Sequence, residues 1–153
     1  MKPQLQPLLH PDQLDLLDLL DLLAEEARSQ GHRMLDRLQQ EWREGTNRFD
    51  REGECVLIAV REDRIVGVCG LNRDPYCSLK DIGRVRRLYV ASGVRRRGVG
   101  RLLVEAIQQR CPGVFQQLRL RTNSSAASAF YQALGFRPVE DEPDCTHVWT
   151  VSA

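Results

Sequence analysis

The segment RVRRLYVASGVRRRGVGRLL, residues 84–103, passes from a run that ends in Leu88-Tyr89-Val90 into a turn of arginines and glycines. Val85 to Val90 has the composition of a β-strand. Leucines, an alanine and an isoleucine then recur at helical spacing, at positions 102, 103, 106 and 107. The first N–H groups of a helix lack backbone partners and favour negative charge, and glycines let an anion approach closely. The segment therefore predicts an anion site between a strand and a helix.

Two nucleotide-binding motifs do not fit this turn. A phosphate-binding loop of the Walker A type would need Lys and Ser or Thr after its second glycine, where this sequence has Arg101 and Leu102. A dinucleotide-binding turn of the Rossmann type would need a third glycine. A tight turn with a solvated run of charge remains the alternative when the glycines are considered alone.

The rest of the chain alternates between helical and strand patterns. A β-hairpin is expected where Glu62-Asp63 separates two apolar runs, and Thr122-Asn123-Ser124 forms a helix-capping cluster. In chain order we expect a helix from Pro11-Asp12 to Ser29, a helix over Met34–Glu44, strands over Val56–Val60, Ile65–Leu71 and Val85–Val90, a helix ending at Pro112-Gly113, a strand over Val114–Leu120, a helix ending at Leu134, and a last strand over Thr146–Val151.

Composition narrows the class of protein. The 153 residues are 42% hydrophobic, enough for one domain, and 22 Lys and Arg against 21 Asp and Glu give a formal charge of +1, which disfavours a nucleic-acid binder. Asp15, Asp18 and Asp21 interrupt the Leu-rich start, so we expect no membrane span.

The first residues lack a secretory pattern, and five cysteines without a CxxC pair fit reduced thiols, so a cytoplasmic location is expected. The three histidines show no metal-ligand spacing, and no metal is expected.

A second motif follows the first at a defined distance. Its residues are Ala127, Phe130, Tyr131, Leu134, Gly135 and Phe136. With Arg95-Arg96-Arg97-Gly98-Val99-Gly100, which meets the pattern R/Q-x-x-G-x-G/A, this segment resembles the GNAT superfamily of acyl-CoA-dependent N-acetyltransferases. The resemblance covers roughly Glu54 to Arg137, whereas the first 50 residues match only in having two helices.

The resemblance implies an α/β fold of the GNAT type. A mixed, mostly antiparallel sheet flanked by helices would have splayed central parallel strands, at Val85–Val90 beside Val114–Leu120. A single acetyltransferase domain would span residues 1–153. The family's acceptor site is shaped by the region before the sheet, so the divergent first helices would determine the substrate.

The resemblance also implies acetyl-CoA as a cosubstrate and a set of residues that hold it. Backbone N–H groups from Arg96 to Arg101 would bind the pyrophosphate, and the Val90 N–H would polarise the thioester carbonyl. Tyr131 would be the general acid, because a phenol of pKa about 10 can protonate a thiolate whose acid has a pKa near 8.5. The cofactor-binding residues implied are Leu88, Tyr89, Val90, Arg95, Arg96, Arg97, Gly98, Val99, Gly100, Arg101, Asn123 and Ser124.

The sequence departs from the family pattern at two places. Ser124 stands seven residues before Tyr131, where the family often has an Asn, and Asn123 lies one residue earlier, so either could contact the pantetheine arm or Asn123 could cap the helix. Many family members have a glutamate that acts as general base on the central strand, where this sequence has arginines 84, 86 and 87. These arginines could form a solvated rim, or they could line a pocket for an anionic acceptor. No general base is assigned, with His147 or a water-linked carboxylate as options.

The predicted function is transfer of an acetyl group from acetyl-CoA to a primary amine by direct attack. The acceptor would be a small molecule or a peptide, and a homodimer is one option for the assembly. A non-catalytic acyl-CoA sensor is the alternative, and an RNA- or DNA-binding protein is a weaker one.

Overall fold

The structure is a computed structural model that describes residues 3–7 and 14–152, with the backbone alone for residues 7 and 14–19. Its elements follow the chain in the order β1 (Gln4–Pro7), α1 (Leu14–Ser29), α2 (Met34–Glu44), β2 (Cys55–Arg61), β3 (Arg64–Arg73), β4 (Ile82–Val90), the short 3₁₀ helix η1 (Ser92–Val94), α3 (Val99–Gln109), β5 (Gln117–Leu120), α4 (Ser125–Ala133), β6 (Arg137–Pro138) and β7 (His147–Thr150).

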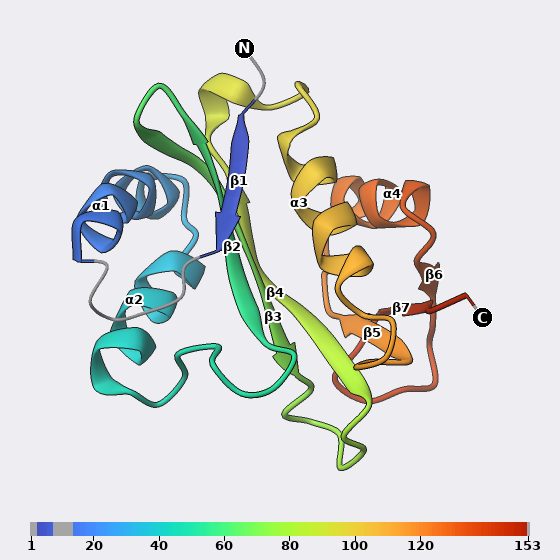
Figure 1. Cartoon of the computed structure of the whole chain (residues 1–153). Helices are drawn as coiled ribbons and strands as arrows, with labels where there is room; N and C mark the ends of the chain where they lie inside the picture. Colours follow the sequence, from blue (N-terminus) through green and yellow to red (C-terminus); the bar gives the residue numbers. More distant parts are fainter. Residues whose placement is uncertain (1–2, 8–13, 153) are drawn as a thin grey trace.

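The described strands form one seven-stranded sheet in the order β1-β2-β3-β4-β5-β7-β6. Only β4 and β5 are parallel, with Ile82, Gly83 and Arg84 opposite Gln117, Leu118 and Arg119; the other neighbouring pairs are antiparallel. Helices α1 and α2 cover one face and α3 and α4 the other (Figure 1). This confirms the predicted mixed, mostly antiparallel α/β sheet with a central parallel pair.

Each face of the sheet has its own hydrophobic cluster. On the α3/α4 face, Leu57, Cys69 and Leu71 pack with Leu103 and Ile107. On the α1/α2 face the cluster contains Val56, Ile58 and Val68 together with Leu38 and Trp42. Alternate residues of β2 and β3 thus enter opposite clusters, as the two-residue period of a strand requires.

Several predicted boundaries differ from the structure. The strands β1 and β6 were not predicted, since a run of two to four residues that contains proline carries little strand signal. Strand β4 begins three residues earlier than expected, at Ile82. Strand β5 begins at Gln117 rather than Val114, because Val114 and Phe115 both donate their N–H groups to the Cys111 carbonyl in a turn.

Two expectations concern the helices. The predicted start of the first helix at Pro11-Asp12 lies outside the described residues, and α1 is described from Leu14. Leu102, expected on the buried face of α3, is 40% exposed, whereas Leu103, Val104 and Ile107 are buried. Among the described residues, no helix combines the length and the apolar character needed to cross a lipid bilayer.

The start of α3 is held tightly against β3 at Gly67. A Cβ atom placed on Gly67 would lie 2.9 Å from Leu103 Cδ1 and 3.0 Å from Val99 Cγ1. Leu103 and Val99 are both buried, at 0% and 3% exposure, so neither can move aside freely. The missing side chain at Gly67 therefore sets how closely the turn before α3 approaches the sheet.

We predict that Gly67→Ala lowers the free energy of unfolding by about 1–3 kcal/mol, because the added methyl overpacks the contact with α3. Urea unfolding monitored by circular dichroism measures the change. Gly93→Ala is the matched control: no heavy atom lies within 4 Å of a Cβ placed there, so its effect should stay within about 0.5 kcal/mol. Equal stability of the two variants would show that α3 does not depend on the Gly67 contact.

Candidate functional site

Strand β4 contains a β-bulge next to the place where it leaves β5. Val68 faces Tyr89 and Gly70 faces Arg86, so one residue of β3 stands opposite both Arg87 and Leu88. Arg87 has a φ of 60°, in the left-handed region that bulges use. The register with β5 covers only residues 82–84, while β4 continues to Val90 along β3. The two parallel strands therefore diverge after Arg84, as predicted for the splayed pair.

The backbone of Val90 faces the β5 side of β4. The N–H of Ala91 donates to the carbonyl of Val66 on β3 at 2.8 Å. In an antiparallel ladder, the N–H and the carbonyl of one residue point to the same side of the strand, and those of the next residue point to the other side. Because the Ala91 N–H points to β3, the N–H and carbonyl of Val90 point away from β3. The Val90 carbonyl accepts a hydrogen bond from Arg95 Nε at 3.0 Å. The Val90 N–H thus points toward the side where β4 and β5 diverge.

The turn after η1 has the backbone of an anion-binding concavity. Arg96 and Gly98 have φ values of 67° and 81°, and left-handed residues between ordinary ones turn successive N–H groups toward one side. Gly98 is also the N-cap of α3, and a Cβ placed on it meets no heavy atom within 4 Å. The space in front of the turn is open, and this backbone fits a phosphate group.

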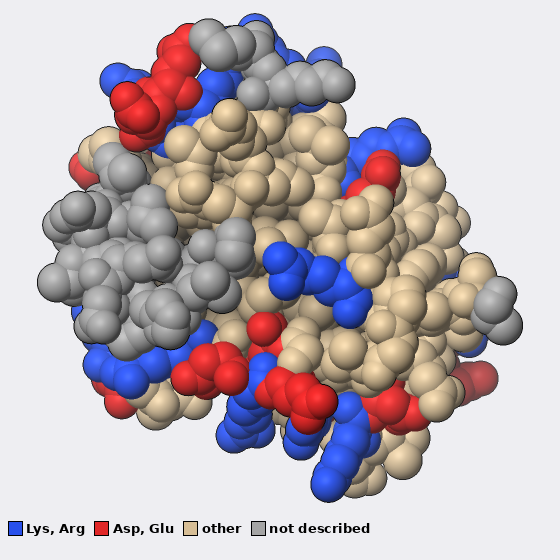
Figure 2. Space-filling model, viewed as in Figure 1, with Lys and Arg blue, Asp and Glu red and all other residues tan. Residues whose placement is uncertain are grey.

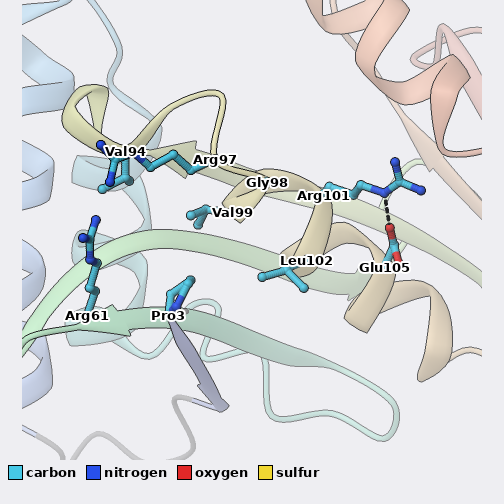
Figure 3. Close-up of a pocket in the computed structure, with 9 residues that line it drawn as sticks. All are labelled: Pro3, Arg61, Val94, Arg97, Gly98, Val99, Arg101, Leu102 and Glu105. Carbon is cyan, nitrogen blue, oxygen red and sulfur yellow. Dashed lines mark hydrogen bonds and ion pairs between the residues drawn. The ribbon is translucent and has the colours of Figure 1, made fainter. Parts of the chain in front are cut away.

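A cavity of about 550 Å³ lies beside this turn. Figure 3 shows its lining, which comes from the turn and the first residues of α3 on one wall and from the β1–β2 edge of the sheet on the other. The lining residues are Pro3, Arg61, Val94, Arg97, Gly98, Val99, Arg101, Leu102 and Glu105.

The three arginines of the motif do not share one role. Arg95 lies over the Tyr89 ring, with its Cζ atom 5.3 Å from the centroid, and donates to Gln30 Oε1 at 2.9 Å, so it connects the turn to the residue that follows α1. Arg97 lines the cavity, and Arg96 is exposed. Arg101, further along, forms an ion pair with Glu105 one helical turn away. Arg95 is thus a contact within the fold, and Arg97 is the motif's cation at the cavity.

Tyr89 was predicted to bind the cofactor, but its side chain lies on the face of the sheet that α1 and α2 cover. Its hydroxyl donates to Glu26 Oε2 on α1 at 2.5 Å, and burial together with this bond raises the pKa of Tyr89 to about 12. Glu26 also accepts from the Ser92 N–H at 3.2 Å and the Ser92 hydroxyl at 3.1 Å. Burial alone raises the pKa of Glu26, but these hydrogen bonds outweigh it and lower the pKa. Glu26 therefore anchors the segment that leads into the turn.

Tyr131 lies on α4 in an aromatic clamp. It is 8% exposed, and its ring makes edge contacts with Phe130 and Phe136 at centroid separations of 5.0 and 5.4 Å. Burial raises its pKa above that of a free phenol, and the Cys69 thiol of β3 is close enough to add to the shift. A Cβ on Gly100 would lie 3.3 Å from Phe130 Cζ and 3.6 Å from Val90 Cγ2. The two sequence motifs therefore meet at the end of β4.

The residues before α4 have separate places. Ser124 is the N-cap, since its hydroxyl accepts from the Ala127 N–H at 3.2 Å. The suggestion that Asn123 caps the helix is therefore wrong, because the cap position belongs to Ser124, whose φ of −98° and ψ of 128° suit it. Asn123 is exposed.

His147 is held between two hydroxyl groups. Its Nε2 and Nδ1 atoms each lie 2.8 Å from a hydroxyl oxygen, of Ser128 and Thr146 respectively. The side chain is buried, and burial lowers its pKa, so the ring is neutral near pH 7. Its ring centroid lies 6.4 Å from that of Tyr131. These contacts fix His147 as a support for α4.

The strand arginines are not a solvated rim. Arg84 is 6% exposed, pairs with Asp74 at 3.5 Å, and donates to the Asp144 carbonyl at 2.7 Å. Arg87 pairs with Glu41 on α2 at 2.6 Å, and its side chain is 11% exposed. Arg86 donates to Asn72 Oδ1 at 3.3 Å. Each of these arginines has an acceptor, which offsets the cost of burying its charge. The contacts of Arg84 and Arg87 also join segments that are far apart in the chain.

Sequence reasoning missed Glu26 and Arg61. Nothing in a helix pattern distinguishes Glu26 from the acids around it, and Arg61 ends a strand some 30 residues before the motif. On the face shown in Figure 2, Lys and Arg side chains along the lower rim lie among Asp and Glu side chains rather than in one continuous patch.

Comparison with known proteins agrees with this geometry. The family model described as an acetyltransferase (GNAT) domain matches residues 52–138, which contain both motifs. A protein of Exiguobacterium sp. 255-15 assigned as an acetyltransferase shares the fold with a TM-score of 0.80 at 23% identity, covering 98% of this chain and 94% of that one.

Two further solved structures are more distant. The PaiA N-acetyltransferase of Thermoplasma acidophilum, solved in complex with coenzyme A, has a TM-score of 0.67 at 15% identity and covers 98% of this chain and 99% of that one. The ribosomal-protein-S18-alanine N-acetyltransferase of Escherichia coli has a TM-score of 0.56 at 18% identity over 75% of this chain and 77% of that one. At these identities the likeness shows the fold, whereas the family model matches more than half of the chain. The chain therefore belongs to the GNAT acetyltransferase family.

Proposed function

We propose that this acyltransferase moves an acetyl group from acetyl-CoA to a primary amine of a small molecule or a peptide, by direct attack of the amine. The observation that carries the proposal is that Phe130 and Val90 both lie against Gly100, 3.3 and 3.6 Å from the position that a Cβ would take there. Phe130 thus brings the helix of Tyr131 to the turn and to the diverging end of β4. This packing supports a reaction in which the turn binds an anion, the Val90 N–H is a backbone donor and the phenol of Tyr131 is the acid.

The residues of the chain have distinct roles in the proposed reaction. The thioester supplies the acetyl group. The backbone N–H groups of residues 96–101 hold the pyrophosphate, and the Val90 N–H donates to the thioester carbonyl oxygen; one such donor is typically worth ~3–4 kcal/mol of barrier. The backbone of Leu88 and the side chain of Asn123 or Ser124 contact the pantetheine arm.

Atoms balance without a covalent enzyme intermediate. The amine nitrogen forms the new C–N bond as the C–S bond breaks, and the electron pair of that bond leaves with sulfur. Tyr131 gives its hydroxyl proton to the thiolate, and the proton lost by the amine passes to water, from which Tyr131 is reprotonated. Burial raises the pKa of Tyr131, so the phenol is protonated at neutral pH as a proton donor must be, although the same shift makes it a weaker acid toward the thiolate than a free phenol.

Substitutions at Gly98 test whether the turn binds the pyrophosphate. Asp and Asn tolerate a positive φ better than other side chains, and a Cβ at Gly98 has open space, so Gly98→Asp and Gly98→Asn should both fold. They differ by one negative charge in front of the turn. Gly98→Asp should bind acetyl-CoA at least about tenfold more weakly than Gly98→Asn, which corresponds to a loss of ~1.4 kcal/mol of binding free energy. Isothermal titration calorimetry measures both, and equal affinities would remove the turn from the pyrophosphate site.

Removal of the Tyr131 hydroxyl tests its role as general acid. Tyr131→Phe keeps the aromatic clamp and removes the proton, so kcat should fall about a hundredfold or more while the Kd for acetyl-CoA is unchanged. In the parent, the loss of kcat that follows deprotonation of Tyr131 should lie above pH 10, because the folded-state pKa is raised above the ordinary value of 10.0. Release of free thiol from acetyl-CoA with a panel of primary amines measures the rate.

Tyr76→Phe is the matched control, because Tyr76 is 59% exposed on a loop, and it should keep full activity. If Tyr131→Phe turned over like the parent, Tyr131 would not be the general acid. A parent that bound acetyl-CoA and released no thiol with any amine in the panel would act as an acyl-CoA sensor instead.

A further inference from the structure

The cavity beside the turn contains two cations whose charge is not neutralised within the described part of the chain. Arg61 and Arg97 both line it. Arg61 Nε is buried and has no hydrogen-bond partner among the described residues. Glu105 is the carboxylate on the same lining, and it is paired with Arg101. Two like charges that share a cavity without a counter-ion repel each other, and an anion between them relieves the repulsion.

The geometry of the cavity separates a charged end from an apolar wall. In Figure 3 the guanidinium groups of Arg61 and Arg97 lie at the same end, while Arg101 and Glu105 lie at the other. Arg61 comes from the end of β2, on the same sheet face as Ala59, which belongs to the α3/α4 cluster. Pro3 and the exposed Leu102 add apolar surface to the lining. This arrangement fits a ligand with a phosphate at one end and an aromatic ring that can pack on apolar side chains beside it.

The position of the cavity relative to the turn indicates which part of a ligand it takes. Helix α3, with the turn at its start, lies between the β1–β2 edge of the sheet and α4 (Figure 1). The cavity is lined from that β1–β2 edge and from the turn and α3, whereas Tyr131 is on α4. A coenzyme held at the turn by its pyrophosphate has a thioester arm on one side of that group and an adenosine that bears a 3′-phosphate on the other. With the thioester directed to Tyr131, the adenosine end extends toward the cavity.

We propose that Arg61 and Arg97 bind the 3′-phosphate of the coenzyme and that Pro3 and Leu102 contact its adenine ring. The proposal rests on the function proposed above and adds to it a residue of β2, remote in sequence from the motif. A guanidinium suits this task because its planar set of donors can bind two phosphate oxygens at once.

Binding of coenzyme A and of 3′-dephospho-coenzyme A tests the proposal. The parent should bind coenzyme A at least tenfold more tightly than the dephospho form. Arg61→Gln should reduce this preference to threefold or less by weakening coenzyme A alone, with the Kd for 3′-dephospho-coenzyme A unchanged. Arg110→Gln is the control: Arg110 is exposed at the opposite end of α3, and its variant should keep the preference of the parent.

The outcomes separate the two proposals. A parent that bound both ligands equally, or an Arg61→Gln variant that kept the full preference, would overturn the 3′-phosphate site and leave the proposed function standing. Equal weakening of both ligands by Arg61→Gln would also overturn it, because the arginine would then act on the fold or on the pyrophosphate. A folded parent that bound neither ligand would overturn the proposed function itself.

Discussion

Strand β4 has to pair with β3 along almost its whole length while it leaves β5 after three residues. The bulge at Arg87 and Leu88 lies where these two demands meet, since an extra residue on one strand bends that strand and increases its local twist. Beyond the bulge the strand still pairs with β3, and Val90 directs its backbone toward the β5 side. The positions of the turn, of α3 and of the tyrosine on α4 are all set relative to this end of β4.

The turn itself is held from both faces of the sheet. Its approach to the sheet depends on the absence of a side chain at Gly67, against which Val99 and Leu103 pack. From the other face, Glu26 on α1 binds Tyr89 and Ser92, and Gln30 binds Arg95. These contacts hold the backbone N–H groups of the turn in place before the ligand binds. The entropy cost of ordering the turn on binding is therefore smaller, which favours affinity. The conspicuous arginine at the start of the motif therefore contributes to the shape of the turn.

Much of the fold could be predicted from the sequence, because the long elements have clear periodicity. The patterns of β2, β3, α2, α3 and α4 agree with the structure to within a few residues. The edge strands β1 and β6 could not be predicted, since short segments with proline gain their form from a neighbouring strand. For the site, the glycine motif and Tyr131 could be placed on their elements, whereas the bulge at Arg87 has no residue signature because arginine rarely adopts a positive φ. Arg61 reaches the cavity only through the pairing of distant strands.

The two hydrophobic clusters described on opposite faces of the sheet have a consequence for how the protein can change. Substitutions at sites that share no contacts usually add in their effects on stability. Among the described residues, the two layers are linked through Glu26, Gln30 and Glu41 and through Ala91, which packs against both clusters. Changes among the α1/α2 residues away from these links should therefore leave the packing of α3 and α4 nearly unchanged. The α1/α2 layer can therefore change in sequence while the α3/α4 layer keeps its geometry. A library of variants confined to α1 and α2, with these links retained, would change the surface of that layer with little effect on the turn.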